Sequence, residues 1–127
     1  MSDPNVRGNQ HYLNTIDILH QLNDVSPSFC LAKWYNVSLH LPTGMTHSCY
    51  HPPSHHVPVE EIKIDVSALH NTKYKKQQRQ LMLDGKRPSE CHFCWEIEDN
   101  SKHLSDRAYR SKDVYQPDII DLALRNF

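Results

Sequence analysis

Hydrophobic and polar positions in the first half of the chain repeat with two different periods. Residues 11–23 (HYLNTIDILHQLN) place apolar side chains at helical intervals, which predicts a short amphipathic helix. Residues 31–41 (LAKWYNVSLHL) alternate between polar and apolar side chains, which predicts a β-strand. Gly44 follows in a Pro-Thr-Gly turn, where glycine adopts backbone conformations that other residues resist. Residues 45–50 are therefore expected to return as the second strand of a hairpin.

The clearest helical pattern lies beyond a proline-rich stretch, residues 51–58, which we expect to be an irregular loop. Residues 71–85 (NTKYKKQQRQLMLDG) are flanked by residue types that begin and end helices. Asn71 or Thr72 can cap the N-terminus, and Gly85 suits the position just after the C-terminus.

The last third of the chain is more polar. Ser89 is expected to cap a short helix whose first turn holds Cys91 and Cys94. Backbone N–H groups at a helix start stabilise anionic sulfur, so this turn suits thiolate ligands. The sequence beyond Ser101 is polar until residues 117–126, where a proline at the first helical position predicts a final helix.

Composition narrows the classes of protein to which the chain can belong. Its 127 residues are 38% hydrophobic, which leaves little apolar material for a large core. We therefore expect a covalent cross-link or a bound metal to stabilise the fold. A net charge of -1, from 14 basic and 15 acidic residues, argues against nucleic acid or an anionic membrane as partner. The chain lacks an apolar run of membrane-spanning length and a secretory signal, so we expect a cytoplasmic protein. No catalytic residues are predicted, because no triad, phosphate-binding glycine loop or carboxylate pair is recognisable.

The four cysteines are the residues that carry chemistry. Disulfides persist in oxidising compartments, so in a cytoplasmic protein a metal site is favoured over two disulfides or unligated thiols. Cys91 and Cys94 are separated by two residues, and the hairpin is expected to bring Cys30 close to Cys49. Four thiolates can complete either a [4Fe-4S] cluster or a tetrahedral zinc site. The predicted fold class is therefore α+β, a small single domain with a β-hairpin and several helices around a four-cysteine metal site.

A looser group of histidines surrounds Cys49. These histidines could form a second metal site, but histidines in loops are mostly solvated. They are His47, His51, His55 and His56. Three aromatic residues, Trp34, Phe93 and Trp95, are expected to pack around the cysteines.

The cysteine spacing resembles that of a known family. Cys30, thirteen residues, Gly44, four residues and Cys49 are similar to the signature of SPASM and twitch domains, the auxiliary cluster modules of radical SAM enzymes. Cys91 and Cys94, approached through GKRPSEC, resemble the remainder of a twitch domain. The segments FCLAKWYN, HSCYHPP, SALHNTKYKKQQRQLMLDGKRPSECHFCWEIED and SDRAYRS resemble the N-terminal part of twitch-containing radical SAM proteins from phages and marine microbes. The resemblance implies that the four cysteines bind an auxiliary [4Fe-4S] cluster.

The extent of this resemblance suggests how the chain is organised. It covers residues 29–111, so we expect an N-terminal helical extension over residues 1–28, a twitch-like cluster-binding domain over 29–111, and a C-terminal helical tail over 112–127. Radical SAM catalysis needs a further three-cysteine motif, which this chain lacks. The resemblance therefore implies a module that serves a radical SAM core in cis or trans, by electron transfer or by positioning, and is not catalytic alone. The alternative is a zinc-stabilised interaction domain without a redox role.

Overall fold

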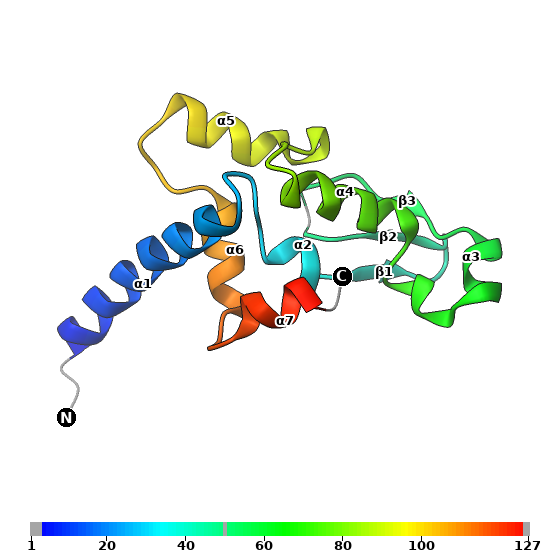
Figure 1. Cartoon of the computed structure of the whole chain (residues 1–127), viewed down its shortest axis with the longest axis horizontal. Helices are drawn as coiled ribbons and strands as arrows, with labels where there is room; N and C mark the ends of the chain where they lie inside the picture. Colours follow the sequence, from blue (N-terminus) through cyan, green and yellow to red (C-terminus); the bar gives the residue numbers. More distant parts are fainter. Residues whose placement is uncertain (1–3, 50, 126–127) are drawn as a thin grey trace.

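The computed structural model describes residues 4–49 and 51–125, with side chains from residue 15 onward in these ranges. The described residues form a small α+β domain of seven α-helices, two 3-10 helices and one three-stranded antiparallel sheet (Figure 1). In chain order the elements are α1 (Pro4–Val25), α2 (Ala32–Tyr35), β1 (Ser38–His40), β2 (Met45–His47), β3 (His55–His56), α3 (Val59–Ile64), η1 (Val66–Leu69), α4 (Lys73–Leu83), η2 (Ser89–Cys91), α5 (His92–Asn100), α6 (Asp106–Val114) and α7 (Ile119–Arg125).

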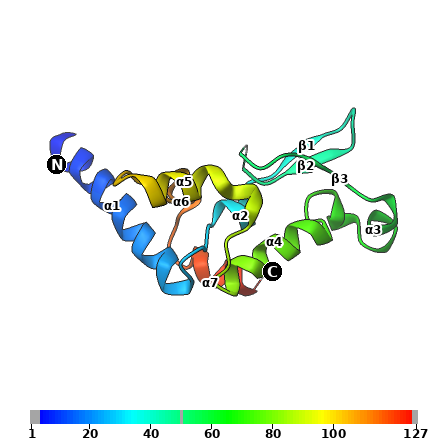
Figure 2. The same cartoon turned by 90° about the horizontal axis from the view of Figure 1, so that it is seen from above.

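The helices and the sheet are arranged along one long axis. Helix α1 lies at one end, the sheet and α3 lie at the other, and the remaining helices lie between them (Figures 1 and 2). Helix α1 packs against α6, and the short helix α2 packs against both α4 and α6. Elements distant in the sequence therefore meet around α2, at the centre of the domain.

The hydrophobic core surrounds the segment that leads into α2. Phe29 and Leu31 are completely buried there. Leu22 from α1, Met82 from α4, Trp95 from α5 and Ile119 and Ala123 from α7 complete this core. Three of the four cysteines, Cys30, Cys91 and Cys94, belong to the same cluster. The cysteines are thus part of the core, in which a change of volume is felt by neighbouring side chains.

Helix α1 extends the helix predicted for residues 11–23 in both directions. The predicted helix lies within it, although the side chains of residues 11–14 fall outside the described ones. No helix in the described ranges is both long enough and apolar enough to span a membrane.

The predicted hairpin is confirmed, but the strand predicted for residues 31–41 is largely wrong. Strands β1 and β2 pair with His40 opposite Met45, and Gly44 has a φ of 67° in the connecting turn. The first part of the predicted strand is instead the helix α2, in which Tyr35 donates a backbone hydrogen bond to Leu31. Residues 32–34 are buried where α2 packs against α4 and α6, and a helix satisfies their backbone groups internally.

A third strand forms within the stretch predicted to be an irregular loop. In β3, His56 lies opposite Met45 and His55 lies opposite Thr46. The sheet order is therefore β1-β2-β3. The two-residue strand had no alternating apolar pattern by which it could be recognised.

Helix α4 begins and ends as the sequence predicts. The Thr72 side chain accepts a hydrogen bond from the Lys75 backbone N–H and caps the N-terminus. Gly85, with a φ of 75°, donates to the Met82 carbonyl, and Lys86 donates to the Leu81 carbonyl. These two bonds form a Schellman motif, in which glycine tolerates the left-handed conformation.

The C-terminal third departs from prediction in three places. Ser89 makes no capping hydrogen bond from its side chain and lies in η2, so the predicted cap is wrong. Helix α6 was not predicted, although Ser105 caps it by accepting from the Arg107 N–H. The predicted final helix exists as α7, but it begins at Ile119, and Pro117 lies before it.

Candidate metal centre

All four cysteines line one cavity. Cys30 precedes α2, Cys49 follows β2, Cys91 ends η2 and Cys94 lies in the first turn of α5. The cavity encloses about 380 Å³ including its opening to solvent, and Ala32, Met82 and Trp95 supply apolar parts of its wall. Cys30, Cys91 and Cys94 are buried, whereas Cys49 is partly exposed. Three separate segments of the chain thus place thiols around the same space.

The cysteines are not clustered into a metal site, which corrects the fold prediction. Among the described residues, no three His, Cys, Asp or Glu side chains are arranged to hold a metal ion. All four cysteines are free thiols, which argues against the two-disulfide alternative. The sulfurs instead contact different polar groups of the protein. The Cys30 sulfur lies 3.9 Å from the Arg107 carbonyl oxygen, while the Cys91 sulfur lies 3.3 Å from Lys33 Nζ.

Burial favours the protonated form of three of these thiols, Cys49, Cys91 and Cys94. It raises the pKa of Cys91 to about 12, although Lys33 partly opposes this shift. Burial likewise raises the pKa of Cys94 to about 11 and raises that of Cys49. Loss of these protons therefore requires a compensating positive charge in the cavity, which is the effect of a bound metal on its thiol ligands.

Hydrogen-bond donors already point at all four sulfurs, and the donor to Cys30 is the Ser111 hydroxyl, at 3.7 Å. Lys33 Nζ donates to Cys91 at 3.3 Å. The backbone N–H groups of His51 and Arg107 donate to the sulfurs of Cys49 and Cys94, respectively. N–H groups aimed at sulfur stabilise the thiolate form, so each donor favours an anionic ligand.

Lys33 and Glu90 form a buried ion pair beside Cys91. Their side chains are 4% and 8% exposed, and Glu90 also accepts a 2.7 Å hydrogen bond from the Tyr74 hydroxyl. Burial lowers the pKa of Lys33, but the charges and hydrogen bonds of Cys91 and Glu90 outweigh burial, so the net shift is upward. Lys33 is therefore held as a cation within reach of a cavity sulfur.

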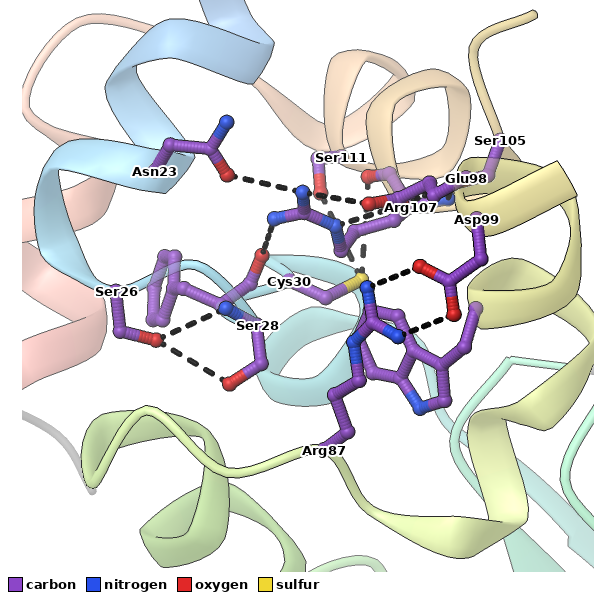
Figure 3. A network of polar contacts seen from close by, with 12 residues as sticks. Asn23, Ser26, Ser28, Cys30, Arg87, Glu98, Asp99, Ser105, Arg107 and Ser111 are labelled. Atoms are coloured by element: carbon purple, nitrogen blue, oxygen red, sulfur yellow. Dashed lines mark hydrogen bonds and ion pairs between the residues drawn. The ribbon is translucent and has the colours of Figure 1, made fainter. Parts of the chain in front are cut away.

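Arg107 connects the cavity to the surrounding helices (Figure 3). Its guanidinium donates to both carboxylate oxygens of Glu98, at 2.9 and 3.0 Å. It also donates to the Phe29 carbonyl at 2.8 Å and to Asn23 Oδ1 at 2.9 Å. One buried side chain thus fixes the end of α1, the segment before Cys30, α5 and α6.

Ser111 supports Cys30 from the next turn of α6. Its hydroxyl lies 3.7 Å from the Cys30 sulfur and accepts a 3.0 Å hydrogen bond from the Leu31 N–H. Figure 3 places this hydroxyl beside the sulfur, on the α6 side. Helix α6, which the sequence pattern did not reveal, therefore forms one side of the cysteine cavity.

The predicted histidine group near Cys49 is divided among different partners. His51 pairs with Asp106 at 2.6 Å and stacks on Phe93 with ring centroids 4.0 Å apart. His55 hydrogen-bonds Thr72 at 2.7 Å, on the side of the sheet that faces α4. His56 is exposed on β3, and His47 faces His40. The four histidines predicted as one group do not form one site.

The sequence argument missed the charged residues around the cavity. Lys33 lies within a predicted strand, and Arg107 lies in the polar stretch beyond Ser101, for which no helix or strand was predicted. Glu98 follows the second cysteine pair in an acidic stretch without a recognisable motif, and it pairs with Arg107. The Ser-Asp-Arg run at 105–107 carried the one available signal, since serine and aspartate are typical of a helix start. Trp95 contacts the cavity as expected, whereas Phe93 is 44% exposed.

Comparisons with known proteins do not assign the chain to a family. No family model, no curated protein and no solved structure matches it. The functional argument therefore depends on the residues of the cavity and on the cysteine spacing.

Proposed function

We propose that this chain is an auxiliary [4Fe-4S] cluster-binding module that serves a radical SAM enzyme, with Cys30, Cys49, Cys91 and Cys94 as the ligands. The observation that carries the proposal is that all four cysteines, from three separate segments, line one cavity. Four cysteines form the usual ligand set of such a cluster. The resemblance of their spacing to twitch domains supports the same ligand set.

A single zinc ion and a [4Fe-4S] cluster require different spacings of the four cysteine sulfurs. Zinc at about 2.3 Å from each of four sulfurs requires neighbouring sulfurs about 3.8 Å apart. The described side chains are not gathered in this way around any single-ion position. A [4Fe-4S] cluster places a block of iron and sulfide between its ligands, so its thiolates stand farther apart around a common space.

The polar groups around the cavity suit an anionic cofactor. Four thiolates give a bound cluster a net negative charge, and hydrogen bonds to its sulfurs set its reduction potential. Lys33 and the N–H groups of His51 and Arg107 already donate to three of the sulfurs. Trp95 and Met82 form apolar parts of the cavity wall. The chain therefore supplies charge compensation together with a partly apolar lining for such a group.

The role that follows is electron transfer or positioning. When bound, a cluster with four cysteine ligands would exchange single electrons while leaving no iron open to substrate. The four cysteines are the only ones in the chain, so no ligands remain for a second cluster that cleaves S-adenosylmethionine. Catalysis would then belong to a radical SAM core in the same or another polypeptide. The isolated 127-residue chain should form no 5′-deoxyadenosine under reducing conditions.

Anaerobic reconstitution followed by metal analysis tests the proposal. We expect about four iron and four sulfide per chain, with loss of bound iron when Cys30, Cys49, Cys91 or Cys94 is replaced by serine. His92→Ala is the matched control, because His92 lies between two of the ligands in sequence but is exposed. Stoichiometric zinc without iron would instead support the zinc-stabilised interaction domain and exclude the cluster.

A further inference from the structure

Two histidines meet on the hairpin, outside the cysteine cavity. His40 lies opposite Met45, and His47 is two residues farther along β2. Side chains of residues i and i+2 share one face of a strand, so His40 and His47 are diagonal neighbours on the same face of the sheet. His40 is exposed and His47 is partly exposed, so both rings are accessible from solvent.

The nitrogen atoms of the two rings converge. His40 Nε2 and His47 Nε2 lie 3.1 Å apart, and the ring centroids are 5.2 Å apart. His47 Nδ1 lies 2.9 Å from the Cys49 carbonyl oxygen. A carbonyl can only accept a hydrogen bond, so Nδ1 of His47 carries the proton and its Nε2 presents a lone pair. This arrangement matches histidine metal ligands, which usually donate their other ring N–H to a carbonyl or carboxylate.

We propose that His40 and His47 form a zinc-binding site in which water completes the coordination. Two imidazole nitrogens bound to zinc at 2.0–2.1 Å in a tetrahedral arrangement lie about 3.3 Å apart. The observed pair is 3.1 Å apart, about 0.2 Å less than this separation, so binding requires a small opening and a turn of the rings that directs both lone pairs at the ion. Because the His47 Nε2 accepts, the His40 Nε2 carries the proton of their 3.1 Å contact. On binding, His40 changes tautomer: Nε2 releases its proton to solvent while Nδ1 takes one up, so both Nε2 atoms become ligands of neutral rings.

The site differs from the cysteine centre in its ligands and in its expected effect on the protein. It has two protein ligands, so its affinity is weaker than that of a four-ligand structural zinc site. Its ligands come from β1 and β2, so the ion fastens the two strands of the hairpin together. Through the hydrogen bond from His47 to the Cys49 carbonyl, the ion also restrains the loop that carries one cavity thiol. The inference rests on the imidazole geometry alone and does not require a cluster.

The test is an anaerobic titration of the full-length chain with Zn²⁺, followed by NMR of the histidine ring nitrogens. We expect the Nε2 signals of His40 and His47 to shift together and to saturate, while those of His56 do not. His40→Gln should lower the zinc affinity reported by His47 by about tenfold or more. His56→Gln is the matched control, because His56 is exposed on the neighbouring strand and should leave the response unchanged.

The NMR signals of individual histidine rings distinguish zinc bound at this site from zinc bound by the cysteine thiols. Zinc bound by the cysteines alone would leave the ring signals of His40 and His47 at their metal-free positions, and this result would overturn the proposal. Equal, non-saturating shifts at every exposed histidine would overturn it as well. His40→Gln is the primary variant, because His40 is at the exposed end of the hairpin, and amide spectra would verify that the variant is folded.

Discussion

Two arginines pair with carboxylates of helix α5, one in a buried position and one in an exposed position. Together they allow the effect of burial on the stability contributed by an ion pair to be measured. Arg107 and Arg87 each grip a carboxylate of α5 with two hydrogen bonds, Arg107 to Glu98 and Arg87 to the adjacent Asp99 (Figure 3). The side chains of the first pair are 3% and 20% exposed, and those of the second are 42% and 52% exposed. Both guanidinium groups also lie near the Trp95 ring. Replacing each arginine by methionine retains apolar packing and removes the charge.

The two substitutions should differ several-fold in their effect on stability. Removing one partner of a buried ion pair costs about 3–5 kcal/mol, because the other charge is left uncompensated. Glu98 keeps some exposure and a 2.6 Å hydrogen bond from Ser105, which favours the lower end of this range. Arg107→Met also leaves the Phe29 carbonyl without its donor, at a cost of about 1 kcal/mol. We therefore expect a loss of about 4 kcal/mol for Arg107→Met and at most about 1 kcal/mol for Arg87→Met.

Urea denaturation of the reduced, metal-free protein, followed by circular dichroism, measures both values. For a domain of this size, the loss predicted for Arg107→Met corresponds to a fall in Tm of about 10 °C or more. Adding Glu98→Gln to Arg107→Met should recover part of the stability, since the uncompensated carboxylate is removed. Losses for the two arginine variants that agree within about 0.5 kcal/mol would refute the argument from burial.

Two further predictions concern α4. Thr72→Ala should lower the free energy of unfolding by about 1–2 kcal/mol, because Thr72 caps the helix and hydrogen-bonds His55. Thermal denaturation measures this loss. Thr72→Ser is the control, and its stability should be close to that of the parent, because serine keeps the hydroxyl. Burial, with Arg79 and Lys33 nearby, lowers the pKa of Lys75 from its ordinary value of 10.5 to about 8. Between these two pH values Lys75 is protonated more often in the unfolded chain than in the folded one. The parent should therefore gain stability relative to Lys75→Gln as the pH rises from about 7 to about 9.5, and a constant difference in urea midpoints across that range would contradict the assigned shift.

Elements determined by local chemistry could be predicted from the sequence. Thr72 and Gly85 marked the ends of α4, and Gly44 marked the hairpin turn, because each of these residues acts on its own stretch of backbone. The gathering of the cysteines at one cavity also followed from their spacing and the hairpin. Their arrangement as the ligands of an assembled metal site did not appear.

Elements determined by distant contacts could not be predicted. The alternation over residues 31–41 suggested a strand, but α2 is helical because it is enclosed by α4 and α6, which lie far away in sequence. Helix α6 has few apolar residues, and its buried face is polar, with Arg107 and Ser111 hydrogen-bonded inside the domain. A search for hydrophobic periodicity misses such a helix, since the pattern that defines it is one of hydrogen bonds.

The late position of α6 in the sequence affects how the protein is made. Ser111 lies 81 residues after Cys30, the thiol that it covers. A ribosome adds about 5–20 residues per second, so several seconds pass between the synthesis of the thiol and the synthesis of the helix that shelters it. During this interval the Cys30 sulfur lacks both its Ser111 contact and the α6 side of the cavity. The complete cysteine cavity therefore forms only after the last third of the chain has been made.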